Sequence, residues 1–246
     1  MDRRHFLHSV NSIGVGALSP LLAMAPPNVP RIATPSNSSS MNEGKAGFQV
    51  GLVGVGGAGV NVLSVLIGRL PSYFRMIAIN TDASSRHNMP AYRKILVGGI
   101  PDNPARSEAA RRSIVRRNAW SAADQIAEAV AGLNMLLIVA GMGGMAGTMI
   151  SPVVAQVASK RRAVTIGVPI FPFDWEGNRR NQVARDGARE FGRCVDSMFP
   201  ISNDAIAQSA GVDASMDDVF SKVSMVVRWV FLRASATAQL RQFLDE

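Results

Sequence analysis

Two glycine-rich stretches, each directly after an apolar run, constrain the fold of this chain more than any other feature of its sequence. Residues 54–59 follow the apolar run 48–53, and residues 141–148 follow the run 133–140. Each run is typical of a buried strand, and the residues after each glycine stretch have the apolar spacing of a helix. A strand, a glycine-rich turn and a helix in that order direct backbone N–H groups and a positive dipole end to one point. Both stretches therefore predict an anion-binding turn; the alternative for either alone is a plain connection whose glycines allow close packing.

The first stretch also has the spacing of a dinucleotide-binding turn. Gly54, Gly56 and Gly59 match G-x-G-x-x-G, and Asp82 stands near the place of the acid that binds a ribose hydroxyl in such sites. A Rossmann-type NAD(P) oxidoreductase is one function that this pattern indicates. It leaves the second glycine stretch without a role, so a site that uses both turns is the better interpretation.

The apolar pattern of residues 48–244 predicts alternating strands and helices. The expected strands are 48–53, 74–79, 95–97, 134–140, 163–168 and 195–200, and the expected helices are 58–70, 104–118, one from near 120, 148–160, 176–193 and 216–244. This alternation predicts an α/β fold, a Rossmann-like parallel sheet with helices on both faces. Ligands of such sheets bind at the carboxyl ends of the strands, where both glycine turns are expected.

Composition excludes several classes of site. A single cysteine, Cys194, excludes an internal disulfide and a cysteine-rich metal centre, and the three histidines have no ligand spacing. The net charge of +8 is concentrated in the arginines of 106–117 and in 160–162. This charge indicates either a patch for an acidic partner, anionic lipid or nucleic acid, or a solvated basic face. Because no aromatic platform accompanies it, the solvated face is favoured and no specific nucleic-acid partner is expected.

Five segments in one order carry a family resemblance. They are VGVGGAGVN (53–61), INTD (79–82), AGMGGMAGT (140–148), FPFDWEGNRR (171–180) and PISND (200–204). Together they resemble the successive nucleotide-binding segments of the tubulin/FtsZ superfamily, in particular its bacterial cell-division branch. The resemblance runs from about residue 48 to about 232 and implies a nucleotide-binding domain that takes GTP or GDP, with Mg²⁺ as a further possible ligand.

The resemblance also implies roles for individual residues. Those expected around the phosphates are Gly56, Gly57, Ala58, Gly59, Asn61, Asn80, Asp82, Gly143, Gly144, Gly147 and Thr148. Those expected around the ribose and the base are Glu176, Arg180, Asn203, Phe220 and Ser224, with Phe220 stacking on guanine. Neither a catalytic residue nor a protein metal ligand is assigned.

The sequence departs from the family pattern at several of these places. Met145, Ala146 and Met149 replace a glycine, a threonine and a glycine, and a left-handed backbone at any of them would cost about 1–2 kcal/mol. Residues 98–104 form a shorter γ-phosphate loop than in the family. Ser224 replaces an asparagine or aspartate that pairs with the base, which leaves the preference for guanine over adenine open.

The end of the sequence predicts weak or absent hydrolysis. The chain reaches Glu246 without the family's Asn-x-Asp-x-x-Asp loop and second domain, so we expect a domain truncated after its nucleotide-binding part. Its long last helix, 216–244, is apolar on more than one face and is expected to mediate self-association or docking on a full-length FtsZ-like homologue. The expected function is a GTP- or GDP-binding protein that modulates a cell-division filament; the alternative is a degenerate module that acts through its basic face or last helix without nucleotide.

Residues 1–40 are expected to lie outside the fold. Residues 2–7 resemble a twin-arginine export signal, the stretch 10–25 is too short and too polar to span a bilayer, and 26–40 is a proline- and serine-rich linker. A start at Met41 would keep the domain 41–246 in the cytoplasm with free GTP, whereas a signal in 1–25 would direct it to the periplasm. The Met41 start is favoured.

Overall fold

The computed structural model describes residues 48–71, 74–82, 93–99 and 107–244, without the side chains of 238–244. The strands of this part form one sheet in the order β3-β2-β1-β4-β5-β6, with β7 also paired to β5, and every pair is parallel. The strands are β1 (Val50–Val55), β2 (Arg75–Asn80), β3 (Arg93–Leu96), β4 (Met135–Gly141), β5 (Val164–Phe171), β6 (Ser197–Met198) and β7 (Ile201–Ser202). The expected leader 1–40, the Met41 start and residues 100–104 of the γ-phosphate loop lie outside the described residues.

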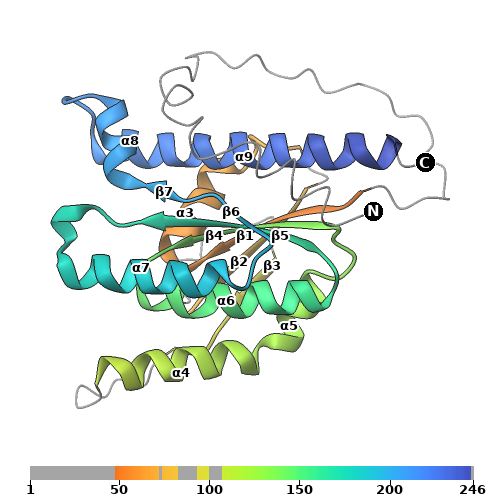
Figure 1. The fold of residues 1–246 in the computed structure, drawn as a ribbon, viewed down its shortest axis with the longest axis horizontal. Coiled ribbons are helices and arrows are strands. Elements are labelled where there is room, and N and C mark those ends of the chain that lie inside the picture. The colour runs from red at the N-terminus through yellow and green to blue at the C-terminus, as the bar shows by residue number, and fades with distance from the viewer. Residues whose placement is uncertain (1–47, 72–73, 83–92, 100–106, 245–246) are drawn as a thin grey trace.

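Helices cover both faces of the sheet, as Figure 1 shows. One face carries α3 (Gly56–Leu66), α8 (Asn203–Ala210) and α9 (Met216–Leu244). The other carries α4 (Glu108–Ser121), α5 (Ala123–Ala129), α6 (Met145–Lys160) and α7 (Asn178–Gly192), which the short 3-10 helix η3 (Asp174–Glu176) precedes. The predicted Rossmann-like α/β fold is confirmed. Within the described residues, no helix combines the length and the apolar character that crossing a membrane requires.

Two hydrophobic cores, one on each face, explain the continuous apolar runs of the central strands. In β1, Val50 and Leu52 belong to the core under α3 and α9, whereas Val53 and Val55 belong to the core under α4–α7. Successive side chains of a strand point to opposite faces, so a strand covered on both faces is apolar at every position. This is why β1 and β4 could be recognised as buried strands.

The long helix α9 is more buried than its apolar sequence led us to expect. Its residues Val219, Val223, Val227, Val230, Phe231 and Ala234 form a stripe packed in the core with α3. The ring of Phe231 meets that of Phe74 edge-on at 4.8 Å, and Arg228 Nε donates to the carbonyl oxygen of Arg69. Among the described α9 side chains, the large apolar ones that are exposed are Met216 and Phe220, in the first turns.

Several element boundaries differ from those expected. The helix α3 begins at Gly56 rather than at 58, and α6 begins at Met145 rather than at 148. Glycine is an uncommon residue inside a helix, so its presence concealed these first turns. The helix α8 was not expected at all, although Ser202 caps it by accepting from the Ala205 N–H at 3.3 Å. The expected strand 195–200 is the shorter β6, with β7 after it.

Close packing of backbone requires two of the glycines. A Cβ added to Gly59 would overlap the carbonyl oxygen of Val139 in β4, and one added to Gly147 would overlap that of Gly141. The packing interpretation therefore holds for these two positions. It does not hold for Gly57 or Gly144, where an added Cβ would meet nothing within 4 Å.

We predict that Gly59→Ala destabilises the fold, because α3 and β4 cannot separate without disturbing both cores. Forcing a methyl group into a packed site typically costs about 1–3 kcal/mol. The matched control is Gly57→Ala, which adds the same methyl group to the same helix in open space and should not lower the free energy of unfolding. Urea unfolding of the nucleotide-free protein measures both; equal stabilities for the two variants would contradict this account of Gly59.

Candidate functional site at the carboxyl edge of the sheet

The strand order reverses between β1 and β4, and both glycine turns lie there. From β1 the chain continues outward through β2 and β3, and then β4 returns to the other side of β1. Val55 pairs with Ala140, so the carboxyl ends of the two strands are level. A reversal of this kind opens the crevice where ligands of open α/β sheets bind. The fold thus places the two turns next to each other.

The two turns are in direct contact. A Cβ built on Gly56 would lie 2.8 Å from the backbone nitrogen of Gly147, and one built on Gly141 would lie 2.7 Å from Cβ of Ala58. Gly56 and Gly143 have φ of 69° and 85°, a conformation that favours glycine. The backbones of the two turns therefore form one continuous surface.

Three helix N-termini at this edge lack compensation for their dipoles. Among the described helices, α3, α6 and α7 have neither a side-chain cap nor an acid in the first turn. The others have one or both, as in α4, where Ser107 accepts from the Ala110 N–H and Glu108 follows. The first N–H groups of a helix have no acceptor within it, and they carry a partial positive charge. The ends of α3 and α6 directly follow β1 and β4 at the carboxyl edge, which suits an anion, whereas α7 follows η3.

Open space in front of the turns allows an anion to approach the backbone. Gly57 is exposed and Gly144 is partly exposed, and no atom stands where their side chains would be. The donors offered by helix geometry are the N–H groups of the first turns, 56–58 in α3 and 145–147 in α6. The turn geometry fits phosphate oxygens bound by backbone amides.

Thr148 lies in the second turn, where its amide and its hydroxyl both have partners within the chain. Its hydroxyl accepts from the Gly143 N–H at 3.0 Å, and its own N–H is bonded to the Gly144 carbonyl. Gly143 and Thr148 thus hold the second turn in shape, and their amides are occupied. Sequence reasoning missed Met145 and Ala146 as donors because it treated them only as departures; their place in the first turn of α6 was the signal.

The methionine and alanine substitutions in the second turn cause no backbone strain. Among the described residues, Arg162 is the non-glycine residue with a positive φ. Met145, Ala146 and Met149 are all helical. The expected cost of a left-handed backbone therefore does not arise at these three positions.

Glu176 and Arg180 lie together beside the second turn. Arg180 Nε is 2.8 Å from Glu176 Oε2, and Glu176 Oε1 accepts from the Phe173 N–H at 2.9 Å. A Cβ built on Gly143 would be 2.8 Å from Cγ of Arg180. The pair is thus positioned at the edge, although the carboxylate already has partners inside the chain.

Asn203, at the start of α8, has an unusual environment. The residue is 8% exposed, and its Oδ1 is the buried side-chain polar atom of the described residues without a hydrogen-bond partner. Next to it, Asp204 accepts from the Asp174 N–H at 3.1 Å, which joins α8 to η3. An unsatisfied buried acceptor is costly, so it fits a ligand that supplies a hydroxyl or amino donor.

Aromatic side chains lie at the same end of the edge. Phe220 is exposed, and its ring meets that of Phe173 edge-on, with 6.4 Å between the ring centroids. The ring of Trp175 stacks on that of Phe173, with 5.3 Å between the centroids. Trp175 is 73% exposed and was not assigned from the sequence. Ser224, in contrast, is 2% exposed and donates its hydroxyl to the Phe220 carbonyl, so it offers no group to a base in this conformation.

The remaining predicted residues follow β1 and β2. Asn80 ends β2, is buried, and accepts through Oδ1 from the Thr81 N–H at 2.8 Å. Asp82 and Asn61 are exposed. Within the part of the chain that the structure describes, no three acids, histidines or cysteines gather as a metal site would require.

Comparison with known proteins identifies the family. Residues 49–211 match the sequence profile described as Tubulin/FtsZ family, GTPase domain. The cell division protein FtsZ of Pseudomonas putida is 34% identical over 176 residues, which are 72% of this chain and 44% of that protein. FtsZ of Pseudomonas aeruginosa is 32% identical over the same shares of the two chains.

Solved structures of FtsZ and its relatives have a similar fold. An empty FtsZ dimer of M. jannaschii has a TM-score of 0.64 and 26% identity, over 78% of this chain and 55% of that one. A GTPγS-bound CetZ2 protofilament of Haloferax volcanii has a TM-score of 0.61 at 22% identity, over 77% and 59%, and bears on the fold alone. The chain spans about half the length of these relatives. Since the matched region contains both glycine turns and the segments that carry Glu176 and Asn203, the chain belongs to the tubulin/FtsZ family, within its GTPase domain.

Proposed function

We propose that this domain binds GTP or GDP at the carboxyl edge of its sheet. The observation that carries the proposal is the meeting of two uncapped helix N-termini, those of α3 and α6, with open space at Gly57 and Gly144. Phosphate oxygens would accept hydrogen bonds from the first amides of both helices. A single-turn dinucleotide site would leave the α6 terminus unused, which disfavours the oxidoreductase alternative.

The sugar and base would extend toward α8 and α9. The orphaned Oδ1 of Asn203 would accept a hydrogen bond from the ligand, and the exposed ring of Phe220 would stack on the base. Mg²⁺ would be bound mainly by the phosphates and water, as is usual for this ion in nucleotide sites. Because Ser224 is turned toward its own helix, discrimination between guanine and adenine falls to Asn203 and the backbone.

We further propose that hydrolysis is slow. The two carboxylates tied into this edge, Glu176 and Asp204, accept from the Phe173 and Asp174 N–H groups. These hydrogen bonds, and the ion pair of Glu176 with Arg180, already engage the carboxylates within the chain, which supports slow hydrolysis. The domain would therefore act as a nucleotide-dependent partner of FtsZ-like filaments, in the cytoplasm where free GTP is found.

The nucleotide proposal predicts that Gly144→Asp abolishes binding without harming the fold. Aspartate is a favoured N-cap residue, and Gly144 has an extended backbone that accepts it. Its carboxylate would repel a phosphate about 4 Å away by about 4 kcal/mol at an effective dielectric constant of about 20. Affinity for GDP should thus fall by at least about 100-fold.

Calorimetric titration with GTP, GDP and ATP in the presence of Mg²⁺ measures this effect. The wild type is expected to bind GTP and GDP at micromolar concentration and ATP more weakly. Ala131→Asp adds the same charge at the opposite edge of the sheet and is the matched control. If the wild type gives no heat with any nucleotide, the degenerate-module alternative replaces the proposal.

We also propose that the chain associates with itself or with a full-length homologue through the end of the molecule that contains the start of α9. Trp175, Val212, Met216 and Phe220 are four of the large apolar side chains that the structure exposes, and all belong to η3, the segment after α8, or the first turns of α9. Exposed apolar groups gathered in this way are typical of association surfaces. The stripe of α9 from Val219 to Ala234 is buried against the core and is not part of this surface.

The association surface predicts a concentration-dependent oligomer. Sedimentation velocity at about tens of micromolar protein, well within the range of weak interfaces, should show dimers or larger species for the wild type. Replacing Trp175 and Val212 together by serine should shift the chain to monomer, whereas Leu96→Ser, an exposed apolar residue on the edge strand β3, should not. A monodisperse wild-type monomer would refute the proposal.

A further inference from the structure

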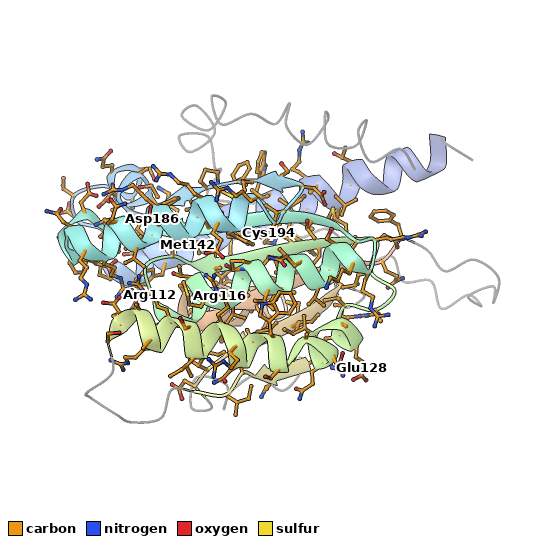
Figure 2. All side chains as sticks on the ribbon, turned by 60° about the horizontal axis from the view of Figure 1, so that its bottom comes forward. Arg112, Arg116, Glu128, Met142, Asp186 and Cys194 are labelled. Carbon is orange, nitrogen blue, oxygen red and sulfur yellow. The ribbon has the colours of Figure 1, made fainter. Side chains whose placement is uncertain are left out.

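A groove lies between α4 and α7, with α6 as its floor. Its volume is about 620 Å³, within the range of small-molecule sites. Side chains from Ala109 to Trp120 form one wall at helical spacing, and Val183 and Gly187 lie on the other. Both walls pack on α6, and the labelled Arg112, Arg116 and Asp186 mark them in Figure 2. None of the residues of this groove other than Thr148 belongs to the candidate nucleotide site.

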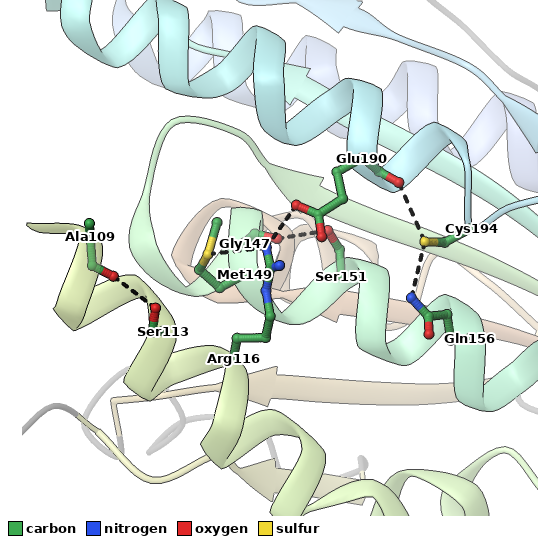
Figure 3. Close-up of polar contacts among 9 residues, drawn as sticks. All are labelled: Ala109, Ser113, Arg116, Gly147, Met149, Ser151, Gln156, Glu190 and Cys194. Carbon is green, nitrogen blue, oxygen red and sulfur yellow. Dashed lines mark hydrogen bonds and ion pairs between the residues drawn. The ribbon is translucent and has the colours of Figure 1, made fainter.

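Among the residues that line the groove, one ion pair joins its two walls. Arg116 of α4 reaches Glu190 of α7 at 2.7 Å, passing over Met149 of α6, as Figure 3 shows. The guanidinium Nη2 also lies 3.7 Å from the Met149 sulfur. These two charges compensate each other, and the apolar surface of Met149 remains beneath them.

The other charges that line the groove or lie beside it leave an excess of positive charge. Glu108 is paired with two guanidinium groups, those of Arg112 and Arg179, so one positive charge there is uncompensated. Asp186 is paired with Arg189 at 3.3 Å. Arg117 lines the groove, and no ion pair is found for it among the described residues.

The end wall of the groove is aromatic. Trp120 is exposed, and Lys160 Nζ lies 5.5 Å from the centroid of its ring. Apolar surface from Met149, Val183 and Trp120 thus lies beside uncompensated guanidinium groups. This combination fits a ligand with an apolar body and one acidic group, because each part finds its complement.

The floor of the groove is shared with the second glycine turn. The methyl group of Thr148 fills the space above Gly187, where an added Cβ would overlap Thr148 Cγ2. The hydroxyl of the same residue accepts from the Gly143 N–H. A ligand that displaces Thr148 would therefore alter the turn.

We propose that the groove between α4 and α7 binds an amphipathic organic anion, and that its occupancy changes nucleotide affinity through Thr148. The first half stands on the groove alone. The second half rests on the proposed nucleotide-binding function.

The first test uses two dyes on the nucleotide-free protein. One is 8-anilinonaphthalene-1-sulfonate, an aromatic anion, and the other is N-phenyl-1-naphthylamine, its uncharged analogue. The wild type is expected to bind one sulfonate dye per chain, about tenfold more tightly than the neutral dye. Saturable binding would appear as a rise in dye fluorescence; a failure to bind the sulfonate dye would overturn the proposal.

Three variants locate the dye. Arg117→Glu is expected to lower the affinity for the sulfonate dye by about tenfold or more and to leave the affinity for the neutral dye unchanged, because it reverses the uncompensated charge. Ser113→Phe is expected to fill the groove from an exposed helix position and to weaken both dyes. Arg111→Glu makes the same charge change on an exposed α4 residue outside the lining, so it is the matched control. The site would be overturned if Arg117→Glu and Ser113→Phe bound the sulfonate dye as tightly as the wild type. It would also be overturned if Arg111→Glu weakened binding of that dye as much as Arg117→Glu does, because either result would place the dye elsewhere.

The second test measures coupling. With the sulfonate dye saturating, the GDP dissociation constant is expected to change by about fivefold, and linkage requires GDP to change the dye affinity by the same factor. Thr148→Ser keeps the hydroxyl, removes the methyl group above Gly187, and is expected to reduce that shift. An unchanged GDP affinity would overturn the coupling and leave the groove site supported by the dye titrations. If no nucleotide binds at all, the proposed function and the coupling fail together, and the dye titrations alone decide the groove.

Discussion

The approach of two backbone turns at the point where the strand order reverses is the constraint on which the site depends. α3 packs so closely on β4 that a Cβ at Gly59 would overlap Val139, and α6 begins so close to β4 that a Cβ at Gly147 would overlap Gly141. These contacts bring the first turns of α3 and α6 together, with Gly56 against the nitrogen of Gly147. The glycines therefore have two separate roles: some permit packing, and others, at 57 and 144, leave the space in which a phosphate can reach the amides.

Charge follows from this geometry. Two helix N-termini that meet without caps or acids would repel each other through their partial positive charges, so the arrangement is stabilised when an anion lies between them. The carboxylates at this edge that have hydrogen bonds from the described backbone, Glu176 and Asp204, hold η3 and α8 in place. Between α4 and α7, in contrast, carboxylates of the chain itself neutralise positive charge. Glu190 of α7 pairs with Arg116 of α4, and Glu108 of α4 pairs with Arg112 and with Arg179 of α7.

The sheet and its edge could be predicted from the sequence because the apolar runs and the glycines are local signals. β1 and β4 are apolar at every position, and each is followed directly by its glycines. The partner that each polar side chain takes could not be predicted from residue type: the hydroxyl of Thr148 accepts from Gly143, the hydroxyl of Ser224 donates to Phe220 one turn earlier in α9, and Oδ1 of Asn203 has no partner. The basic helix α4 gave no sign that its arginines pair with residues of α7, since Arg116 and Glu190 lie far apart in the chain. The burial of α9 was also underestimated, because its apolar residues alone do not say which of them face α3.

The most direct test of the central claim is the response of individual backbone amides to GDP. In ¹H–¹⁵N correlation spectra, we predict the largest shifts at Gly57, Ala58, Met145 and Ala146, whose N–H groups lie in the first turns of α3 and α6. The Gly143 amide should move less, because it already donates to Thr148. Shifts confined to other parts of the molecule, or none at all at saturating GDP, would contradict the claim that the two uncapped helix ends form an anion site.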